Sequence, residues 1–422
     1  MTTHSSLGKL GQSVAGSSSS SASPLLKLGQ ILIGAISTYT ITRQLGDSVW
    51  LGRYFYLSLL TLSNNFGVLS WCLHIPCFIR CKIGQTVVIK SARNDLRITN
   101  ERDVLKKFQS RTQYLRPLID EIVEPTDPPA IVLRHLEDDL LASSNKKKLT
   151  TKEIKYVSKR VLTALKLLHE DGFVHTDVKM DNVLVNFAPS SQGESGLRFT
   201  DIQLADLEST VHITSRYCQE CDGIGTPIWR SPEAQLGLQW GPPTDIWSFG
   251  TMVISMIWGD NFFIFKPKVP RGHDEYELNI LAKYHIFFGP YPCSYSDLAD
   301  RETLAILRYI MASVPSDQLK PFQYASQKEI SPEDREFILR IMKMDPRDSR
   351  QQKSFLKTSG LMELNKQVDR MNGPKSRRRT LFHRGNERYR QLQHNMKTSA
   401  NNTRSIGHLN MPYIQGDASA QP

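Results

Sequence analysis

Cysteine is scarce in this sequence, and the six residues present form no metal-binding pattern. Cys218 and Cys221 make one CxxC pair, but no second pair and no histidine pair stands at the spacing that a zinc site needs. We therefore expect free thiols on a loop. The N-terminus also lacks a charged segment followed by an apolar core, the mark of a secretory signal. Both absences favour a reducing compartment, and we expect a cytoplasmic protein, a nuclear one, or both.

Charged side chains are absent from residues 54–79, a run long enough to cross the roughly 30 Å of a bilayer's hydrocarbon core. Asn64, His74 and Pro76 disfavour such a span, and it would separate two strand-like segments that should pair. We interpret residues 54–82 as an insertion and expect no membrane partner, with a membrane-anchored protein as the alternative. The abrupt edges of the run suggest a retained intron.

Acidic residues are too few near the C-terminus to balance the basic ones. The net charge is +11, and most of the excess lies between Lys366 and Arg404. We therefore predict an atypical, largely disordered basic tail over residues 349–422. Within it, KSRRRT is open to three interpretations: a nuclear signal, a nucleic-acid patch, or a solvated run. We expect no nucleic-acid partner.

Three further segments precede this tail. Residues 1–30 are rich in serine and are predicted to be disordered. Residues 38–136 carry strand-like stretches such as QTVVIKSA and PAIVLRHL, with one helical stretch, TNERDVLKKFQSR. Residues 137–348 are mainly helical and begin with TTKEIKYVSKRVLTALKLLHEDG, whose apolar positions recur every three or four residues. The pattern predicts an α+β chain of two lobes with a ligand site between them.

The stretch GFVHTDVKMDNVLV places three polar side chains between two apolar runs. Asp177 can accept a proton from an attacking hydroxyl, and Lys179 can neutralise a phosphoryl group. Asn182 can ligate a metal ion through its amide oxygen. These are the parts that phosphoryl transfer requires, although the same pattern could be a solvated turn.

Matching parts occur in order along the chain. Asp206 follows an apolar strand-like run and could hold a metal ion that bridges two phosphates. Upstream, TVVIK ends at Lys90, and Glu101 lies on the following helix as its ion-pair partner. Downstream, GTPIWRSPEA and TDIWSFG complete the series, so a coincidence is negligible.

The chain from Thr38 to Asp348 resembles a eukaryotic protein kinase. Thr176, in HTDVKMDN, and Arg230, in WRSPE, make it similar to the SR-protein kinases of the CMGC group. The segment FKPKVPRGHDEYELNILAKYHIFFGPYP resembles the CMGC insert, and the overall likeness is to fungal kinase-like proteins. The resemblance implies a bilobal protein-kinase-like fold, with a small β-rich N-lobe carrying one helix and a larger, mainly α-helical C-lobe.

The same resemblance implies an ATP- and Mg²⁺-dependent transfer of the γ-phosphoryl group to a protein hydroxyl. The implied catalytic residues are Asp177 as base, Lys179 as phosphate clamp, Asn182 and Thr226. The implied metal ligands are Asn182 and Asp206. The implied nucleotide-binding residues are Gly46, Val49, Val88, Lys90, Glu101, Leu133 and Leu184, although core packing explains the apolar ones equally well.

Several further expectations follow from this likeness. Thr226 matches the threonine that hydrogen-bonds near the catalytic aspartate in Ser/Thr kinases, so the acceptor is predicted to be Ser or Thr. Asp245 would brace the backbone of the catalytic loop. Thr176 replaces the arginine that reads an activation-loop phosphate, which makes activation by loop phosphorylation less favoured. The expected partners are ATP and a protein substrate, and we expect a monomer.

Two departures from the family pattern put ATP binding in doubt. The phosphate-covering loop normally reads GxGxxG, but LGDSVWLG offers only Gly46 and Gly52. The DFG motif reads DLE, which puts the carboxylate of Glu208 where glycine gives the backbone freedom beside the metal. The alternative to an active kinase is therefore a pseudokinase that acts as a binding module.

The resemblance stops at Asp348. Similar kinases continue with an arginine and a helix like PTAKELLEDEW, and that arginine pairs with the glutamate equivalent to Glu233. Codons allowed for residues 349–360 encode this helix in another frame, so the tail is also consistent with a frameshift. Glu233 would then be buried without its partner, unless Arg347 or Arg350 replaces it.

Overall fold

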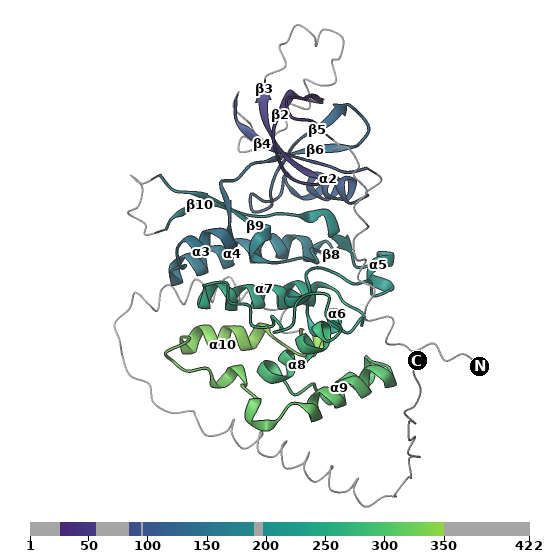
Figure 1. The fold of residues 1–422 in the computed structure, drawn as a ribbon, viewed down its shortest axis with the longest axis vertical. Helices are drawn as coiled ribbons and strands as arrows, with labels where there is room; N and C mark the ends of the chain where they lie inside the picture. The colour runs from purple at the N-terminus through teal and green to yellow at the C-terminus, as the bar shows by residue number, and fades with distance from the viewer. Residues whose placement is uncertain (1–25, 56–83, 94–95, 190–196, 350–422) are drawn as a thin grey trace, which may run out of the picture. The chain divides into compact units, whose positions relative to one another are not determined.

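The computed structural model describes residues 26–55, 84–93, 96–189 and 197–349, all within one compact unit. A small β-rich lobe precedes a larger helical one along the chain (Figure 1). The predicted α+β bilobal fold is confirmed. The predicted tail, most of the serine-rich N-terminus and most of the apolar insertion lie outside the described residues.

The small lobe is a closed antiparallel barrel with the strand order β1-β2-β3-β4-β6-β5. Its strands are β1 (Ile31–Gly34), β2 (Thr38–Gly46), β3 (Val49–Phe55), β4 (Thr86–Ser91), β5 (Leu118–Glu124) and β6 (Ala130–Arg134). One helix, α2 (Leu96–Phe108), lies between β4 and β5 in sequence. Its buried face includes Glu101 and Phe108, so the helix brings a carboxylate into the interior.

The small lobe begins before residue 38. The prediction that residues 1–30 are disordered is wrong for residues 26–30, which the structure describes. Leu26 is buried in the apolar cluster inside the barrel. The strand β1 pairs with β2 and β5. Its turn into β2 is held by Asp120, which accepts hydrogen bonds from the backbone N–H groups of Ile36 and Ser37. A serine-rich composition gave no sign of these long-range contacts.

The insertion starts later than residue 54. Tyr54 lies in β3, pairs with Tyr39 and is buried. Hydrogen bonds of 3.1 and 2.8 Å join Tyr54 to Gln85 and Gly84 and close the base of a hairpin between β3 and β4. The described residues on both sides of 56–83 therefore close the hairpin by themselves. No helix among the described residues is long and apolar enough to cross a bilayer.

The large lobe is built mainly from helices. They are α3 (Leu140–Lys146), α4 (Thr151–Glu170), α5 (Arg216–Gln219), α6 (Pro232–Gln235), α7 (Pro242–Trp258), α8 (Tyr276–Phe288), α9 (Arg301–Ser313) and α10 (Pro332–Ile341). Helix α4 forms where the apolar periodicity predicts a helix, and it begins at a Thr150–Glu153 capping box. Helix α7 is buried over most of its length and forms the centre of the lobe.

Short strands and 3₁₀ turns connect these helices and carry the polar motifs. The strands are β7 (Asp138–Asp139), β8 (Phe173–Val174), β9 (Val183–Phe187), β10 (Phe199–Leu204) and β11 (Val211–His212). The 3₁₀ turns are η4 (Met180–Asn182), η6 (Leu207–Ser209), η7 (Pro227–Trp229), η8 (Cys293–Asp297), η9 (Ser316–Gln318), η10 (Phe322–Tyr324) and η11 (Pro346–Ser349). The catalytic-type motif occupies the connection from β8 through η4 to β9.

Candidate active site

The loop after β8 brings the predicted catalytic side chains together. Lys179 Nζ lies 2.9 Å from Asp177 Oδ2 and donates a 3.1 Å hydrogen bond to the Thr226 hydroxyl. Thr226 in turn donates its backbone N–H to Asp177 Oδ1 at 3.0 Å. Asp177 is therefore held in one orientation from two sides while remaining partly exposed, as a base that meets a substrate must be.

Asp245 of α7 fixes the backbone of this loop. Its carboxylate accepts hydrogen bonds of 2.8 and 2.9 Å from the N–H groups of His175 and Thr176. Thr176 has φ 74°, a left-handed conformation that is unfavourable for a β-branched residue. Its hydroxyl donates to the Ser209 carbonyl at 3.0 Å. Thr176 thus ties the catalytic loop directly to the segment after Asp206.

Asn182 and Asp206 offer oxygen atoms suited to a hard cation. The Asn182 amide nitrogen donates to the Asp177 carbonyl at 2.8 Å, and its amide oxygen accepts no hydrogen bond from the described residues. The carbonyl of Asn182 accepts the N–H of Ala205, which places the two positions side by side. Burial by itself would raise the pKa of Asp206, but Lys90 outweighs it and holds the pKa below its usual value. An ionised carboxylate and a free amide oxygen fit Mg²⁺.

Lys90 of β4 and Glu101 of α2 form the expected ion pair, with Nζ 2.8 Å from Glu101 Oε2. Lys90 also lies 2.7 Å from Asp206 Oδ1. Burial would lower the pKa of Lys90, but the surrounding carboxylates raise it, so the ammonium stays charged. The contact is long-range and joins the small lobe to the segment that carries the predicted metal ligand Asp206.

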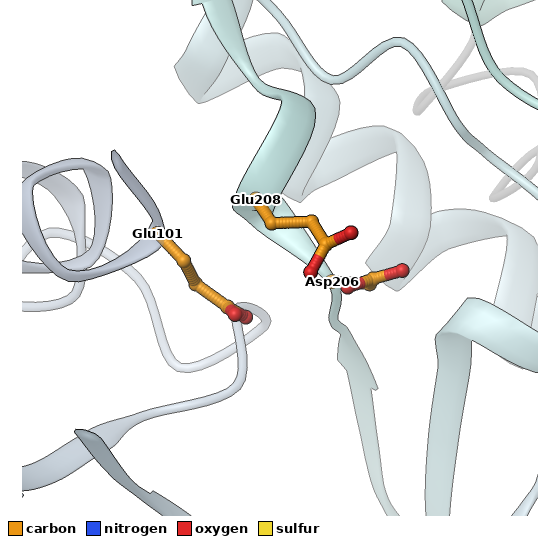
Figure 2. A group of neighbouring side chains, drawn as sticks. All are labelled: Glu101, Asp206 and Glu208. Atoms are coloured by element: carbon orange, nitrogen blue, oxygen red, sulfur yellow. The ribbon is translucent and has the colours of Figure 1, made fainter. Parts of the chain in front are cut away.

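Glu208 adds a third carboxylate beside Lys90. Its Oε2 lies 3.6 Å from Lys90 Nζ. The carboxylate oxygens of Glu101, Asp206 and Glu208 lie within 4.8 Å of one another (Figure 2). Burial and the neighbouring Asp206 raise the pKa of Glu208. Lys90 thus faces three carboxyl groups, and the largely exposed Arg97 lies 3.6 Å from Glu208 as a second cation, which leaves more carboxyl groups than cations where phosphates would bind.

The predicted adenine wall is only partly distinct from the core. Val88 and Leu133 are opposite each other in the β4–β6 register and are both buried in the main apolar cluster. Val49 packs against that cluster. Leu184 of β9 is half-buried and lies outside it. Leu184 is therefore the position that packing explains least, and its contact with adenine stays a prediction.

The loop that should cover phosphates is a tight turn. Gly46 pairs with Val49, so only Asp47 and Ser48 form the tip between β2 and β3. A Cβ atom at Gly46 would meet nothing within 4 Å, which means that no close backbone approach requires glycine there. Asp47 is exposed and negatively charged. The weakened phosphate contact that the missing glycines predict is consistent with this turn and stays a prediction.

Two residues of the site carry no recognisable sequence signal. Asn100 donates its amide N–H to the carbonyls of Glu208 and Thr210 at 3.0 and 2.9 Å and so fastens α2 to the DLE segment. Arg116 is buried and donates to the Arg134 carbonyl at 2.8 Å. Burial lowers the pKa of Arg116 to about 10, and Glu101 and Asp206 oppose this shift. Each of these side chains donates hydrogen bonds to residues more than a dozen positions away in the sequence.

Three other predictions concern neighbouring segments. Cys218 and Cys221 are free thiols, but Cys218 is buried in α5 and not on an open loop. Glu233 is buried, and no cation of the described residues lies within ion-pair distance of it. Arg347 instead binds Asp345, with a 2.9 Å contact. Arg350 lies outside the described residues.

The protein kinase domain family matches residues 77–358, and the chain belongs to this family. A yeast RNA Pol II CTD kinase complex, CTDK-1, contains a chain of similar fold with a TM-score of 0.53 and 16% identity. The match covers 74% of this chain and 88% of that one. At this identity the likeness shows the fold alone.

Curated relatives are Ser/Thr protein kinases. Serine/threonine-protein kinase SMU1 of Mycosarcoma maydis is 33% identical over 179 residues, 42% of this chain and 22% of the relative. The kinase PAK mbt of Drosophila melanogaster is 30% identical over 44% of this chain and 28% of its own. STE20 of Saccharomyces cerevisiae is 36% identical over 26% of this chain and 11% of its own. The match thus spans less than a third of each of these relatives.

Proposed function

We propose that this chain is an ATP-dependent Ser/Thr protein kinase that transfers the γ-phosphoryl group to a protein hydroxyl. The observation that carries the proposal is the joined network of Asp177, Lys179 and Thr226 beside the Lys90–Asp206 contact. Thr226 at this place supports Ser or Thr as the acceptor.

Each residue has a chemical task in this proposal. Asp177 orients the acceptor hydroxyl and takes its proton, while Lys179 balances charge on the transferred group. Lys90, braced by Glu101, binds the phosphates of ATP. Asn182 and Asp206 would hold Mg²⁺, which offsets the negative charge of the phosphates. The protein's contribution is mainly positioning and electrostatics.

The direct test is transfer of labelled phosphate from ATP to a mixture of protein substrates in the presence of magnesium. Wild type is expected to label Ser and Thr residues. ATP binding without any transfer, over the same range of substrates, would count against catalysis.

A pseudokinase is the second candidate because two features of the structure are expected to weaken nucleotide binding. The β2–β3 tip is a two-residue turn. Glu208 enlarges the negative charge around Lys90. Replacing Glu208 tests whether its carboxylate limits the affinity for ATP.

Glu208→Gln is expected to tighten ATP binding roughly three- to tenfold, because it removes a charge that repels phosphate and keeps the size of the side chain. Glu208→Gly is expected to act in the same direction. Calorimetric titration with ATP and Mg²⁺ measures the change. Glu220→Gln, which neutralises an exposed carboxylate further along the same segment, is the control. Unchanged or weaker binding in both Glu208 variants would refute the electrostatic argument.

The assignment to a subfamily of kinases rests on the resemblance of the sequence motifs to the SR-protein kinases. SR-protein-kinase and CMGC character is supported by Thr176 and by Arg230, which donates to the Gly225 carbonyl at 3.1 Å. The relatives described above are STE20- and PAK-type kinases, so this placement stays a prediction. We also propose, from the sequence alone, that the protein is a cytoplasmic or nuclear monomer with no nucleic-acid or membrane partner.

A further inference from the structure

A cavity of about 510 Å³ lies at the end of α7, far along the chain from the catalytic motifs. Aromatic side chains form one part of its wall: Trp258, Phe262 and Phe263. Lys266 and Pro267 form another part. The lining is thus both apolar and basic, which suits an amphipathic ligand.

The turn that shapes this cavity has a left-handed backbone. Gly259, Asp260 and Asn261 all have positive φ, at 71°, 51° and 56°. Glycine, aspartate and asparagine adopt this conformation more readily than other residues, so the local sequence favours the turn. The Asn145 amide donates to Asn261 Oδ1 at 2.8 Å and holds the turn in place. This hydrogen bond fastens the turn to helix α3.

Three further lysines lie on segments that adjoin the cavity, because Phe322 contacts Trp258 of the lining and stacks on Phe288 of α8. Lys268 follows Pro267, and Lys283 lies on α8 with Nζ 5.7 Å from the Phe287 ring centre. The backbone of Lys320 donates to the Ile286 carbonyl at 3.0 Å, which brings a distant segment to the same helix. We call the cavity with Lys266, Lys268, Lys283 and Lys320 the lysine–aromatic pocket.

Among the residues that the structure describes, these ammonium groups have no carboxylate partner at ion-pair distance. Burial lowers the pKa of Lys283, and repulsion from Lys268 and Lys320 lowers it further. Asp260 is the carboxylate on the cavity wall. The cluster keeps an uncompensated positive field next to apolar surface.

The same aromatic side chains continue the pocket toward α8. Trp258 stacks on Phe262 with ring centres 5.6 Å apart and also contacts Phe322. Phe322 stacks on Phe288 at 5.3 Å. The ring faces are thus largely occupied by one another, which leaves little face for a nucleobase to stack on. Phe262 remains 36% exposed and can pack against an aliphatic or aromatic side chain.

We propose that the lysine–aromatic pocket docks an acidic peptide segment with one apolar anchor residue, carried by a protein substrate or partner. The anchor fills the cavity beside Phe262, and the carboxylates lie over the lysines. This inference does not rest on the proposed catalysis, because binding can be measured without ATP. Arginine-rich segments are disfavoured at this surface by like-charge repulsion.

The test measures fluorescence anisotropy of the full chain with three labelled peptides: EEEFEE, EEEAEE and KKKFKK. EEEFEE is expected to bind best, with affinity falling as salt rises. Loss of the phenylalanine and loss of the acidic charge should each weaken binding at least tenfold. Equal binding of EEEFEE and KKKFKK would overturn the proposal.

Variants locate the binding surface. Lys320→Glu, at an exposed position, and Lys283→Glu are each expected to weaken EEEFEE binding by roughly tenfold or more because attraction becomes repulsion. Phe262→Ala should weaken it several-fold. Lys27→Glu, an exposed lysine of the small lobe, is the matched control and should leave affinity unchanged. Thermal melting confirms that each variant is folded.

Two results would overturn the assignment. One is unchanged EEEFEE affinity in folded Lys320→Glu. The other is a labelled single-stranded oligonucleotide that binds at this surface more tightly than EEEFEE and is released by Lys320→Glu, since the surface would then belong to nucleic acid.

Discussion

Replacing Asp177 with alanine is expected to lower phosphoryl transfer by roughly 10²- to 10⁴-fold. The variant should stay folded, because the side chain is partly exposed and the loop backbone is held independently by Asp245. Single-turnover transfer of labelled phosphate, with ATP binding measured in parallel, gives the result.

Asp181→Ala is the matched control for this change. It removes an exposed carboxylate from the same loop, four positions further along, and has no assigned chemical task. Its effect should be far smaller. Equal transfer rates in wild type and Asp177→Ala, with ATP bound in both, would remove the support for Asp177 as base.

Glu233 is expected to make the folded state less stable as the pH rises. Burial raises the pKa of this carboxyl group from 4.5 to about 7. Between these values the native state binds more protons than the unfolded state, so the free energy of unfolding falls with increasing pH. The stability is fully present below pH 4.5, and about 3 kcal/mol of it is lost by pH 7 to 8.

Glu233→Gln removes this ionisation and should therefore raise the free energy of unfolding at pH 8 by ~2–3 kcal/mol relative to wild type. Urea unfolding at pH 5 and pH 8 measures both proteins. The exposed Glu302→Gln variant is the control and should show little change. A Glu233→Gln variant that is less stable at pH 8 would mean that the glutamate has a cationic partner, such as Arg350. The frameshift hypothesis would then lose this support.

Local patterns along the chain predicted much of the fold. The apolar positions that recur every three or four residues predicted α4, because they form one face of a helix that can pack on the core. The run of β-branched residues in QTVVIKSA predicted β4. The catalytic loop was also readable, since Asp177 and Lys179 lie two positions apart in one rigid turn.

Other features depended on contacts that no local pattern encodes. The strand β1 was missed because four residues after a serine-rich stretch are too few to show periodicity, and barrel closure with β5 determines its structure. Leu26 is buried for the same reason.

The sequence by itself determined which side chains could perform phosphoryl transfer, because the family motifs carry Lys90, Asp177 and Asp206 in order. Only the tertiary structure decided their charge environment. It placed Glu208 near Lys90, although the two residues lie far apart in the sequence. It also brought Lys320 beside α8. Electrostatic interactions depend on distance in space and on burial, and neither follows from separation along the chain.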